Sequence, residues 1–179
     1  MLRELRTAAG ILVLFTVLCG GIYPLLVTTL GRLIAPSIDA DLIARDESDP
    51  RRFWPRPSAT AKPHDALSSS GSNLGPSNPA LATAVQERVA KWRAADAGHD
   101  NARPLPIDLV TTSGSGLDPH ISLDGARYQA PRVARVRALS VAQVDAAIDA
   151  VTEGRLLGLF GEPRVNVARL NRQLERLAP

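Results

Sequence analysis

A serine, an aspartate and a histidine lie close together in the segment TTSGSGLDPHIS, residues 111–122. Ser115 and His120 are the residue types that serve as nucleophile and general base in hydrolases. No G-x-S-x-G nucleophile elbow accompanies them, and the Asp-Pro pair that begins at Asp118 is typical of a turn. The turn explains the pattern more simply, so no catalytic residue is assigned. A hydrolase remains the alternative interpretation.

The sequence predicts neither a metal centre nor a phosphate-binding loop. His64, His99 and His120 are scattered, and the single cysteine, Cys19, lies far from all three in sequence. Zinc sites need three or four clustered ligands. The run from Ser113 to Gly116 lacks the lysine and the spacing of a Walker A loop. We therefore expect no metal ion and no cofactor held by this chain itself.

Two long loops rich in glycine, serine, asparagine and proline are the distinctive feature of the polar part of the chain. The first covers residues 57–79 and the second covers residues 111–122. The composition of the first is typical of a flexible linker. Loops of this kind also dock onto partners or bind an anion through main-chain N–H groups. Composition alone leaves both interpretations open.

An uncharged apolar segment near the start of the sequence is expected to anchor this polar part at a membrane. Thr7–Gly31 reads TAAGILVLFTVLCGGIYPLLVTTLG and lies between Arg6 and Arg32. About 25 residues form a helix of roughly 37 Å, and the hydrocarbon core of a bilayer is about 30 Å thick. The segment predicts one membrane-spanning helix. Gly20 and Tyr23 lie on one face of it, where small residues let a partner helix approach.

The charges that flank the span predict its orientation. Arg3 and Arg6 precede it, whereas Arg32 alone follows before acidic residues begin. The positive-inside rule then places the N-terminus in the cytoplasm and the rest of the chain outside the cytoplasmic membrane. A cleaved secretory signal is the alternative. However, the stretch is longer than a signal's apolar region, and Leu33 stands where a cleavage site ending at Ala35 needs a small residue.

Periodicity and capping signals predict the remaining elements. Asn78 and Pro79 are typical of a helix start, and Ser140 with Gln143 forms a capping-box pattern. The expected elements are a helix over Pro79–Ala97, a short strand over Leu105–Val110, a helix over Leu123–Arg137 interrupted by Pro131, a helix from Ser140 to about Glu153, and a short strand over Val165–Val167 before a last amphipathic helix.

The composition after the span suits one ordinary domain. About 145 residues are enough for a single hydrophobic core. The net charge is +3 and the pI is about 9.6, but the arginines are interleaved with acidic residues. This pattern favours a solvated surface over a nucleic-acid partner. We predict an α+β protein with a transmembrane anchor (residues 1–34), a neck (35–56) and one soluble domain (57–179) with a small sheet flanked by helices.

Five unusual strings follow the span in order. They are FWPRPSAT (Phe53–Thr60), SGSNLGPSNP (Ser70–Pro79), DLVTTSGSGLDPHIS (Asp108–Ser122), YQAPRVARVRALS (Tyr128–Ser140) and FGEPRVNVARLN (Phe160–Asn171). Through these strings, which are spread from Phe53 to Asn171, the chain resembles the C subunit of the bacterial high-affinity potassium-transporting P-type ATPase, the Kdp complex.

The resemblance implies a non-catalytic membrane subunit with three partners: a potassium-channel-like subunit, a P-type ATP-hydrolysing subunit and a small single-span subunit. ATP and potassium are then handled by the complex. The resemblance also implies that the subunit acts as a catalytic chaperone that raises the ATP affinity of the pump. The family's proposed nucleotide motif matches Ser69, Ser70, Gly71, Ser72 and Asn73. The predicted topology, however, places the bilayer between this motif and cytoplasmic ATP.

Two departures from the family pattern stand out. The connection between span and domain is shorter than usual, and Ser70 replaces the first of two glycines in the motif. If that position needs a positive φ angle, Ser70 would be strained by about 1–2 kcal/mol. We expect a single-pass inner-membrane subunit that assembles with and stabilises its partners. The residues expected to dock onto them are Gly20, Tyr23, Gly114, Gly116 and Asp118.

Overall fold

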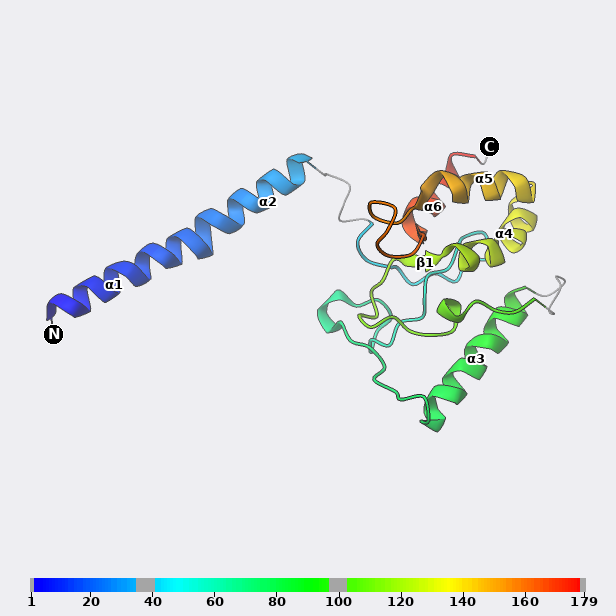
Figure 1. The fold of residues 1–179 in the computed structure, drawn as a ribbon, viewed down its shortest axis with the longest axis horizontal. Helices are drawn as coiled ribbons and strands as arrows, with labels where there is room; N and C mark the ends of the chain where they lie inside the picture. The colour runs from blue at the N-terminus through cyan, green and yellow to red at the C-terminus, as the bar shows by residue number, and fades with distance from the viewer. Residues whose placement is uncertain (1, 35–40, 97–102, 178–179) are drawn as a thin grey trace. The chain divides into compact units, whose positions relative to one another are not determined.

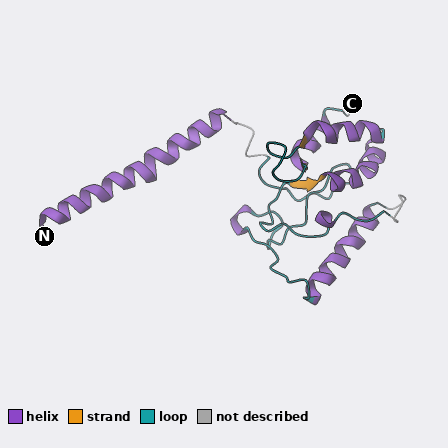
Figure 2. Ribbon diagram, in the orientation of Figure 1, coloured by secondary structure: helices purple, strands orange, loops and turns teal. Residues whose placement is uncertain are grey.

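The structure, a computed structural model, describes residues 2–34, 41–96 and 103–177. The chain divides into two compact units, Met1–Asp39 and Ala40–Pro179. The first unit is a long helix, and the second contains helices and short strands joined by long loops (Figures 1 and 2). The predicted α+β class is confirmed.

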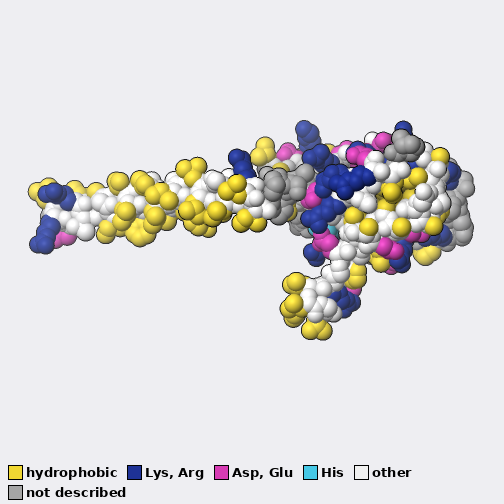
Figure 3. Space-filling model, turned by 90° about the horizontal axis from the view of Figure 1, so that it is seen from above, with side chains coloured by type: hydrophobic (Ala, Val, Ile, Leu, Met, Phe, Trp, Pro, Cys, Tyr) yellow, Lys and Arg dark blue, Asp and Glu magenta, His cyan; other side chains and the backbone are white. Residues whose placement is uncertain are grey.

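The first unit is a continuous helix whose hydrogen-bonding pattern changes once. An α-helix over Leu2–Val17 (α1) passes into a π-helical turn over Leu18–Ile22 (η1) and continues as an α-helix over Tyr23–Ile34 (α2). The turn ends two residues before Pro24, whose ring would clash with the carbonyl four residues earlier in a regular α-helix. The helix is long and apolar enough to cross a membrane, and apolar side chains cover its surface (Figure 3). This agrees with the predicted span.

The second unit contains a small antiparallel sheet. Its strands are His120–Ser122 (β1), Thr152–Glu153 (β2) and Arg164–Asn166 (β3), in the order β1-β3-β2. Val165 lies in the central strand, opposite Ile121 on one side and Thr152 on the other. The strand predicted at Val165–Val167 is thus found one residue earlier. β1 lies in a segment that was expected to be a loop throughout.

The strand predicted over Leu105–Val110 is wrong. Ile107–Leu109 instead forms a short 3-10 turn (η4). The prolines at positions 104 and 106 remove two of the main-chain donors that a strand would need. The Leu109 side chain is buried, and its carbonyl oxygen accepts a hydrogen bond from Trp92 Nε1 at 2.9 Å. The segment therefore contributes its buried leucine to the core from a turn and not from a strand.

Each of the four α-helices described in the second unit begins at a capping side chain. Ser140 and Gln143 form the predicted capping box, and the helix over Leu123–Arg137 continues through Pro131 without the predicted interruption. The predicted end of the first of these helices, Ala97, lies outside the described residues. The helices and their caps are Pro79–Ala95 (α3, Asn78), Leu123–Arg137 (α4, Ser122), Val141–Val151 (α5, Ser140) and Val167–Glu175 (α6, Asn166).

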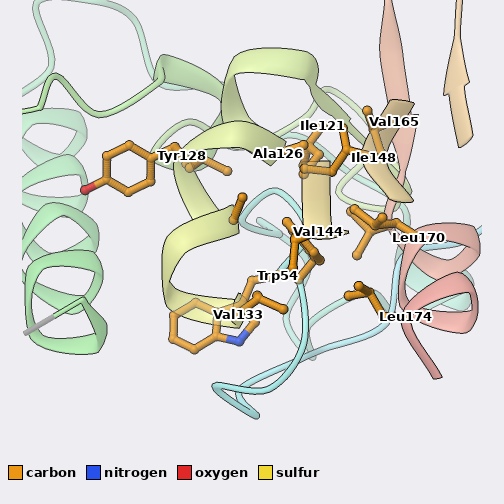
Figure 4. Packing of buried hydrophobic residues seen from close by; sticks show 14 of the residues in the cluster. Trp54, Ile121, Ala126, Tyr128, Val133, Val144, Ile148, Val165, Leu170 and Leu174 are labelled. Carbon is orange, nitrogen blue, oxygen red and sulfur yellow. The ribbon is translucent and has the colours of Figure 1, made fainter. Parts of the chain in front are cut away.

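The core has an aliphatic half and an aromatic half. In the aliphatic half, Ile121 and Val165 of the sheet pack with side chains of α4, α5 and α6, among them Ile148 and Leu170 (Figure 4). The members of the aromatic half are Trp54, Trp92 and Tyr128, with ring centroids 4.8 Å apart for the first pair and 6.3 Å for the second. Two tryptophans thus contribute more to the core than the low aromatic content suggests.

Residues 41–56 lie within the compact unit that begins at Ala40. Phe53 is completely buried, and the side-chain amide of Asn171 pairs with its main chain at 2.8 and 3.1 Å. Gln129 does the same for Trp54, at 2.8 and 3.0 Å. The described part of the expected neck is therefore tied into the domain. Its first residues, 35–40, lie outside the described residues.

Candidate functional site

The two glycine-rich loops lie against each other, backbone to backbone. A Cβ atom added at Gly71 would stand 2.9 Å from the carbonyl oxygen of Gly114, closer than real Cβ contacts allow. Ser69 Oγ also donates a hydrogen bond to the carbonyl of Ser115 at 3.0 Å. The loop Ser69–Asn73 and the loop Ser113–Gly116, far apart in sequence, therefore form one surface, which we call the loop pair.

Gly116 is the most constrained residue of the loop pair. Its φ angle is +70°, and an added Cβ would stand 2.8 Å from the Ser70 carbonyl oxygen and 2.9 Å from Thr60 Cγ2. Ser58 Oγ donates to the Gly116 carbonyl at 2.7 Å, and Gly116 N–H donates to Ser113 Oγ at 2.9 Å. Conformation and close approach both require glycine at this position.

Residues 58–64 support the loop pair from a third segment. Ser58 Oγ lies 2.7 Å from Thr60 Oγ1 and accepts the N–H of His64 at 3.1 Å. Thr60 is buried, and its hydroxyl donates to the carbonyl of Lys62 at 2.6 Å. This stretch belongs to the region whose composition suggested a flexible linker. The structure instead ties it to the loop that carries Gly116.

The serine that replaces a family glycine is accommodated without left-handed backbone. Ser70 is not among the described residues with positive φ, so the strain considered for it does not arise. Within the motif, the positive φ falls on Asn73, at 53°, and asparagine tolerates this conformation better than most residues. The side chains of Ser69, Ser70, Ser72 and Asn73 are exposed. The nucleotide role of this motif stays a prediction.

Asp118 anchors the end of the second loop. Its Oδ1 accepts the main-chain N–H of His120 at 3.0 Å and lies 3.2 Å from His120 Nδ1, while its Oδ2 lies 3.4 Å from Arg56 Nη1. Partial burial raises the pKa of this carboxyl, but the hydrogen bonds from His120 and the charge of Arg56 outweigh burial and hold the pKa below its usual value. Asp118 therefore stays ionised and fixes the turn into β1.

The arrangement around His120 does not assemble the hydrolase set. His120 turns Nδ1 to Asp118, and its Nε2 lies 3.8 Å from Oε2 of Glu153. Ser115 Oγ accepts the N–H of Leu117 at 3.1 Å. Among the described residues, no hydrogen bond joins Ser115 to His120. Both imidazole nitrogens thus face carboxylates, and the nucleophile and base that the sequence suggested are not paired.

Within the described ranges, no group of three His, Cys, Asp or Glu side chains could hold a metal ion. Gly20 belongs to the π-helical turn and Tyr23 begins α2. An added Cβ at Gly20 would meet nothing within 4 Å in the chain itself. Because each hydrogen bond in the turn spans one residue more than in an α-helix, the helical face expected to carry both residues is rotated at this point.

The structure therefore brings together some of the expected site residues. Ser69–Asn73 meets Gly114 and Gly116, whereas Asp118 contacts Arg56 and His120, and Gly20 and Tyr23 belong to the other compact unit. Sequence reasoning missed the contribution of Ser58 and its neighbours to the loop pair. The string FWPRPSAT, which carried part of the family resemblance, was the available signal.

Comparisons with known proteins cover nearly the whole chain. The model of the family described as "KdpC: K+-transporting ATPase, c chain" matches residues 5–176. The "Potassium-transporting ATPase KdpC subunit" of Methylococcus capsulatus is 48% identical over 192 aligned positions, which cover 99% of this chain and 100% of the relative. The proteins of the same description from Methylibium petroleiphilum and Sorangium cellulosum are 50% and 49% identical, and each comparison covers 98% of both chains. The chain therefore belongs to the KdpC family, the c chain of K+-transporting ATPases.

Proposed function

We propose that this chain is the single-span accessory subunit of an ATP-driven, high-affinity potassium-uptake complex. The observation that carries the proposal is the family match over residues 5–176. The relatives are described as subunits of a potassium-transporting ATPase. The long apolar helix supports a place for the chain in the inner membrane.

The flanking charges support an orientation with the N-terminus in the cytoplasm. Arg3 and Arg6 precede the apolar segment and Arg32 follows it, so the positive-inside rule places the domain outside. Protease added to intact spheroplasts then digests the domain and leaves the helix in the membrane. A domain that is protected until the membrane is opened would contradict this orientation.

The proposed role is assembly with, and stabilisation of, a potassium-channel-like subunit, a P-type ATP-hydrolysing subunit and a small single-span subunit. Two parts of the chain suit such contacts. Gly20 leaves the helix surface open to close approach. The loop pair is held rigid by its own backbone contacts yet exposes Ser69, Ser70 and Asn73. A preorganised polar surface loses little entropy on docking.

The chain transports nothing and hydrolyses nothing alone in this proposal, and any effect on ATP affinity passes through the complex. Allosteric coupling requires two states of the pump that both sites bias. A domain bound to the potassium-selective subunit biases those states from outside without touching nucleotide. Direct contact of Ser69–Asn73 with ATP is the competing idea. It predicts saturable protection of the full chain in detergent against heat by millimolar ATP, which we do not expect.

A membrane-anchored hydrolase is the second candidate, and the unpaired Ser115 and His120 count against it. The discriminating experiment is purification of the tagged chain in detergent from potassium-starved cells. The account expects the other three subunits to co-purify and the chain to show no esterase or peptidase turnover. A folded chain that purifies alone and turns over such substrates would overturn it.

A further inference from the structure

The connection between β2 and β3, residues 154–163, exposes four large apolar side chains. The exposed fractions are 70% for Leu156, 82% for Leu157, 74% for Leu159 and 64% for Phe160. Figure 1 shows this connection, which follows α5 and leads to α6 along the chain, as an open orange loop beside α6. Large apolar residues on a water-facing surface normally occur singly, and a contiguous group marks an interaction site.

Four main-chain N–H groups of this loop donate hydrogen bonds to carbonyls within it. Leu156 N–H donates to the Phe160 carbonyl at 2.9 Å, and Phe160 N–H donates back at 3.0 Å. An ion pair between Arg155 and Glu162, 2.7 Å long, closes the base of the loop. Leu157 has a φ angle of 54°, where glycine or asparagine is usual. Such a tip suits the membrane interface, where its apolar side chains enter the acyl boundary while main-chain groups without a partner in the loop still reach water.

The loop leaves the sheet close to the point where the domain is attached to the apolar helix. Arg169 bridges Asp41 and Glu153, with both N–O distances at 2.9 Å, and Asn166 Nδ2 donates to the Asp41 carbonyl at 2.8 Å. Residues 35–40 alone separate Asp41 from Ile34, the last residue of the helix. At about 3.3–3.6 Å per residue, this connection spans at most about 25 Å. The length of this connection therefore limits how far Asp41, and the strands bonded to it, can lie from the end of the helix.

We propose that the tip Leu156–Phe160 inserts into the lipid interface of the leaflet on its side of the membrane, as a second membrane contact beside the helix. Charges at the base of the loop balance, with Arg155 paired to Glu162 and Arg164 paired to Glu153. The contact is therefore apolar and does not depend on anionic lipid. The inference rests on the helix being a membrane span, but not on its orientation or on the partner subunits.

The test uses the full chain with Cys19→Ala, reconstituted alone into phosphatidylcholine vesicles. A spin label on Phe160→Cys should report a depth of about 5–10 Å below the membrane surface, and should be shielded from a water-soluble relaxing agent. The same label on Gln86→Cys, at an exposed position of α3, should remain aqueous. Addition of phosphatidylglycerol should leave the depth unchanged. An aqueous label at position 160 in the anchored chain would overturn the inference, and so would shielding that arises only after the other subunits are added.

A second variant separates insertion from folding. Leu157→Asn suits the positive φ angle, so Leu157→Asn combined with Leu159→Gln should keep the unfolding temperature and release the label at position 160 into water. An unchanged depth in this variant would contradict the proposal. If an alkaline wash extracted the unmodified chain from the vesicles, the helix would not be a membrane span. Both the proposed function and this inference would then be wrong.

Discussion

The loop pair makes a graded prediction for three glycine-to-alanine changes. Gly116→Ala places a side chain at φ +70°, 2.8 Å from a carbonyl oxygen and 2.9 Å from a methyl carbon. Left-handed backbone costs a non-glycine residue about 1–2 kcal/mol, and forcing an atom into packed structure costs about 1–3 kcal/mol. Gly116→Ala should therefore lower the free energy of unfolding by about 2–5 kcal/mol.

Gly71→Ala and Gly114→Ala are matched controls within the same pair of loops. An added Cβ at Gly71 meets the Gly114 carbonyl oxygen at 2.9 Å without a positive φ angle, so only the packing cost of about 1–3 kcal/mol applies. An added Cβ at Gly114 meets nothing within 4 Å. Its replacement should change the free energy of unfolding by less than about 0.5 kcal/mol. The predicted order of damage is Gly116, then Gly71, then Gly114.

Thermal unfolding of the full chain in detergent, followed by the fluorescence of the buried Trp54 and Trp92, provides the assay. For a domain of this size, 1 kcal/mol corresponds to about 3 °C. Gly116→Ala should lower the unfolding temperature by roughly 6–15 °C, Gly71→Ala by about half as much, and Gly114→Ala by less than about 2 °C. The reasoning is refuted if Gly114→Ala is as damaging as Gly116→Ala.

Three further changes follow from other contacts. Arg132→Met should destabilise the domain by about 2–4 kcal/mol, measured by denaturant unfolding, because it removes the donor to the part-buried carbonyls of Pro50 and Arg52, at 2.5 and 3.0 Å, and to the buried Gln129 Oε1, at 3.0 Å. Burial lowers the pKa of Arg132 to about 10, so this side chain is still charged at neutral pH. Burial raises the pKa of Asp41, but hydrogen bonds from Arg169 and Arg172 outweigh it and lower the pKa. The free energy of unfolding that Asp41 contributes is therefore fully present above the unfolded pKa of about 3.9, and it is lost as the pH falls through the lower pKa of the folded state. Asp41→Asn should make the free energy of unfolding fall less steeply at acid pH. An unchanged pH dependence in this variant would refute the prediction. Gly20→Leu should reduce retention of the partner subunits in detergent, whereas equal co-purification would reject this helix face.

Local signals predicted the helices well and the long-range contacts poorly. The Ser140–Gln143 capping box depends only on neighbouring residues, so the sequence carries it in full. The failed strand at Leu105–Val110 depends on distant partners, because the Leu109 carbonyl is taken by Trp92 from another helix. The pairing of Gly71 with Gly114 leaves no periodic trace either. Only the presence of glycine at each position hinted at close approach.

The same distinction explains the segment that read as a linker. Its proline, serine and glycine content indicates a chain that builds no core of its own. Its order comes from hydrogen bonds to other loops, such as Ser58 to Gly116 and Ser69 to Ser115. Phe53 and Trp54, just before it, are held by the amides of Asn171 and Gln129, which lie on α6 and α4. No local pattern identifies those partners.

The central claim is that this chain supports ATP-driven potassium uptake as a docking subunit without a catalytic site of its own. Growth of a strain that lacks the chain, at micromolar potassium, tests it most directly. The unmodified chain should restore growth, and so should the double variant Ser115→Ala/His120→Ala, provided that immunoblots show equal amounts in the membrane. Normal growth of the deletion strain, or failure of the double variant at full membrane abundance, would contradict the account.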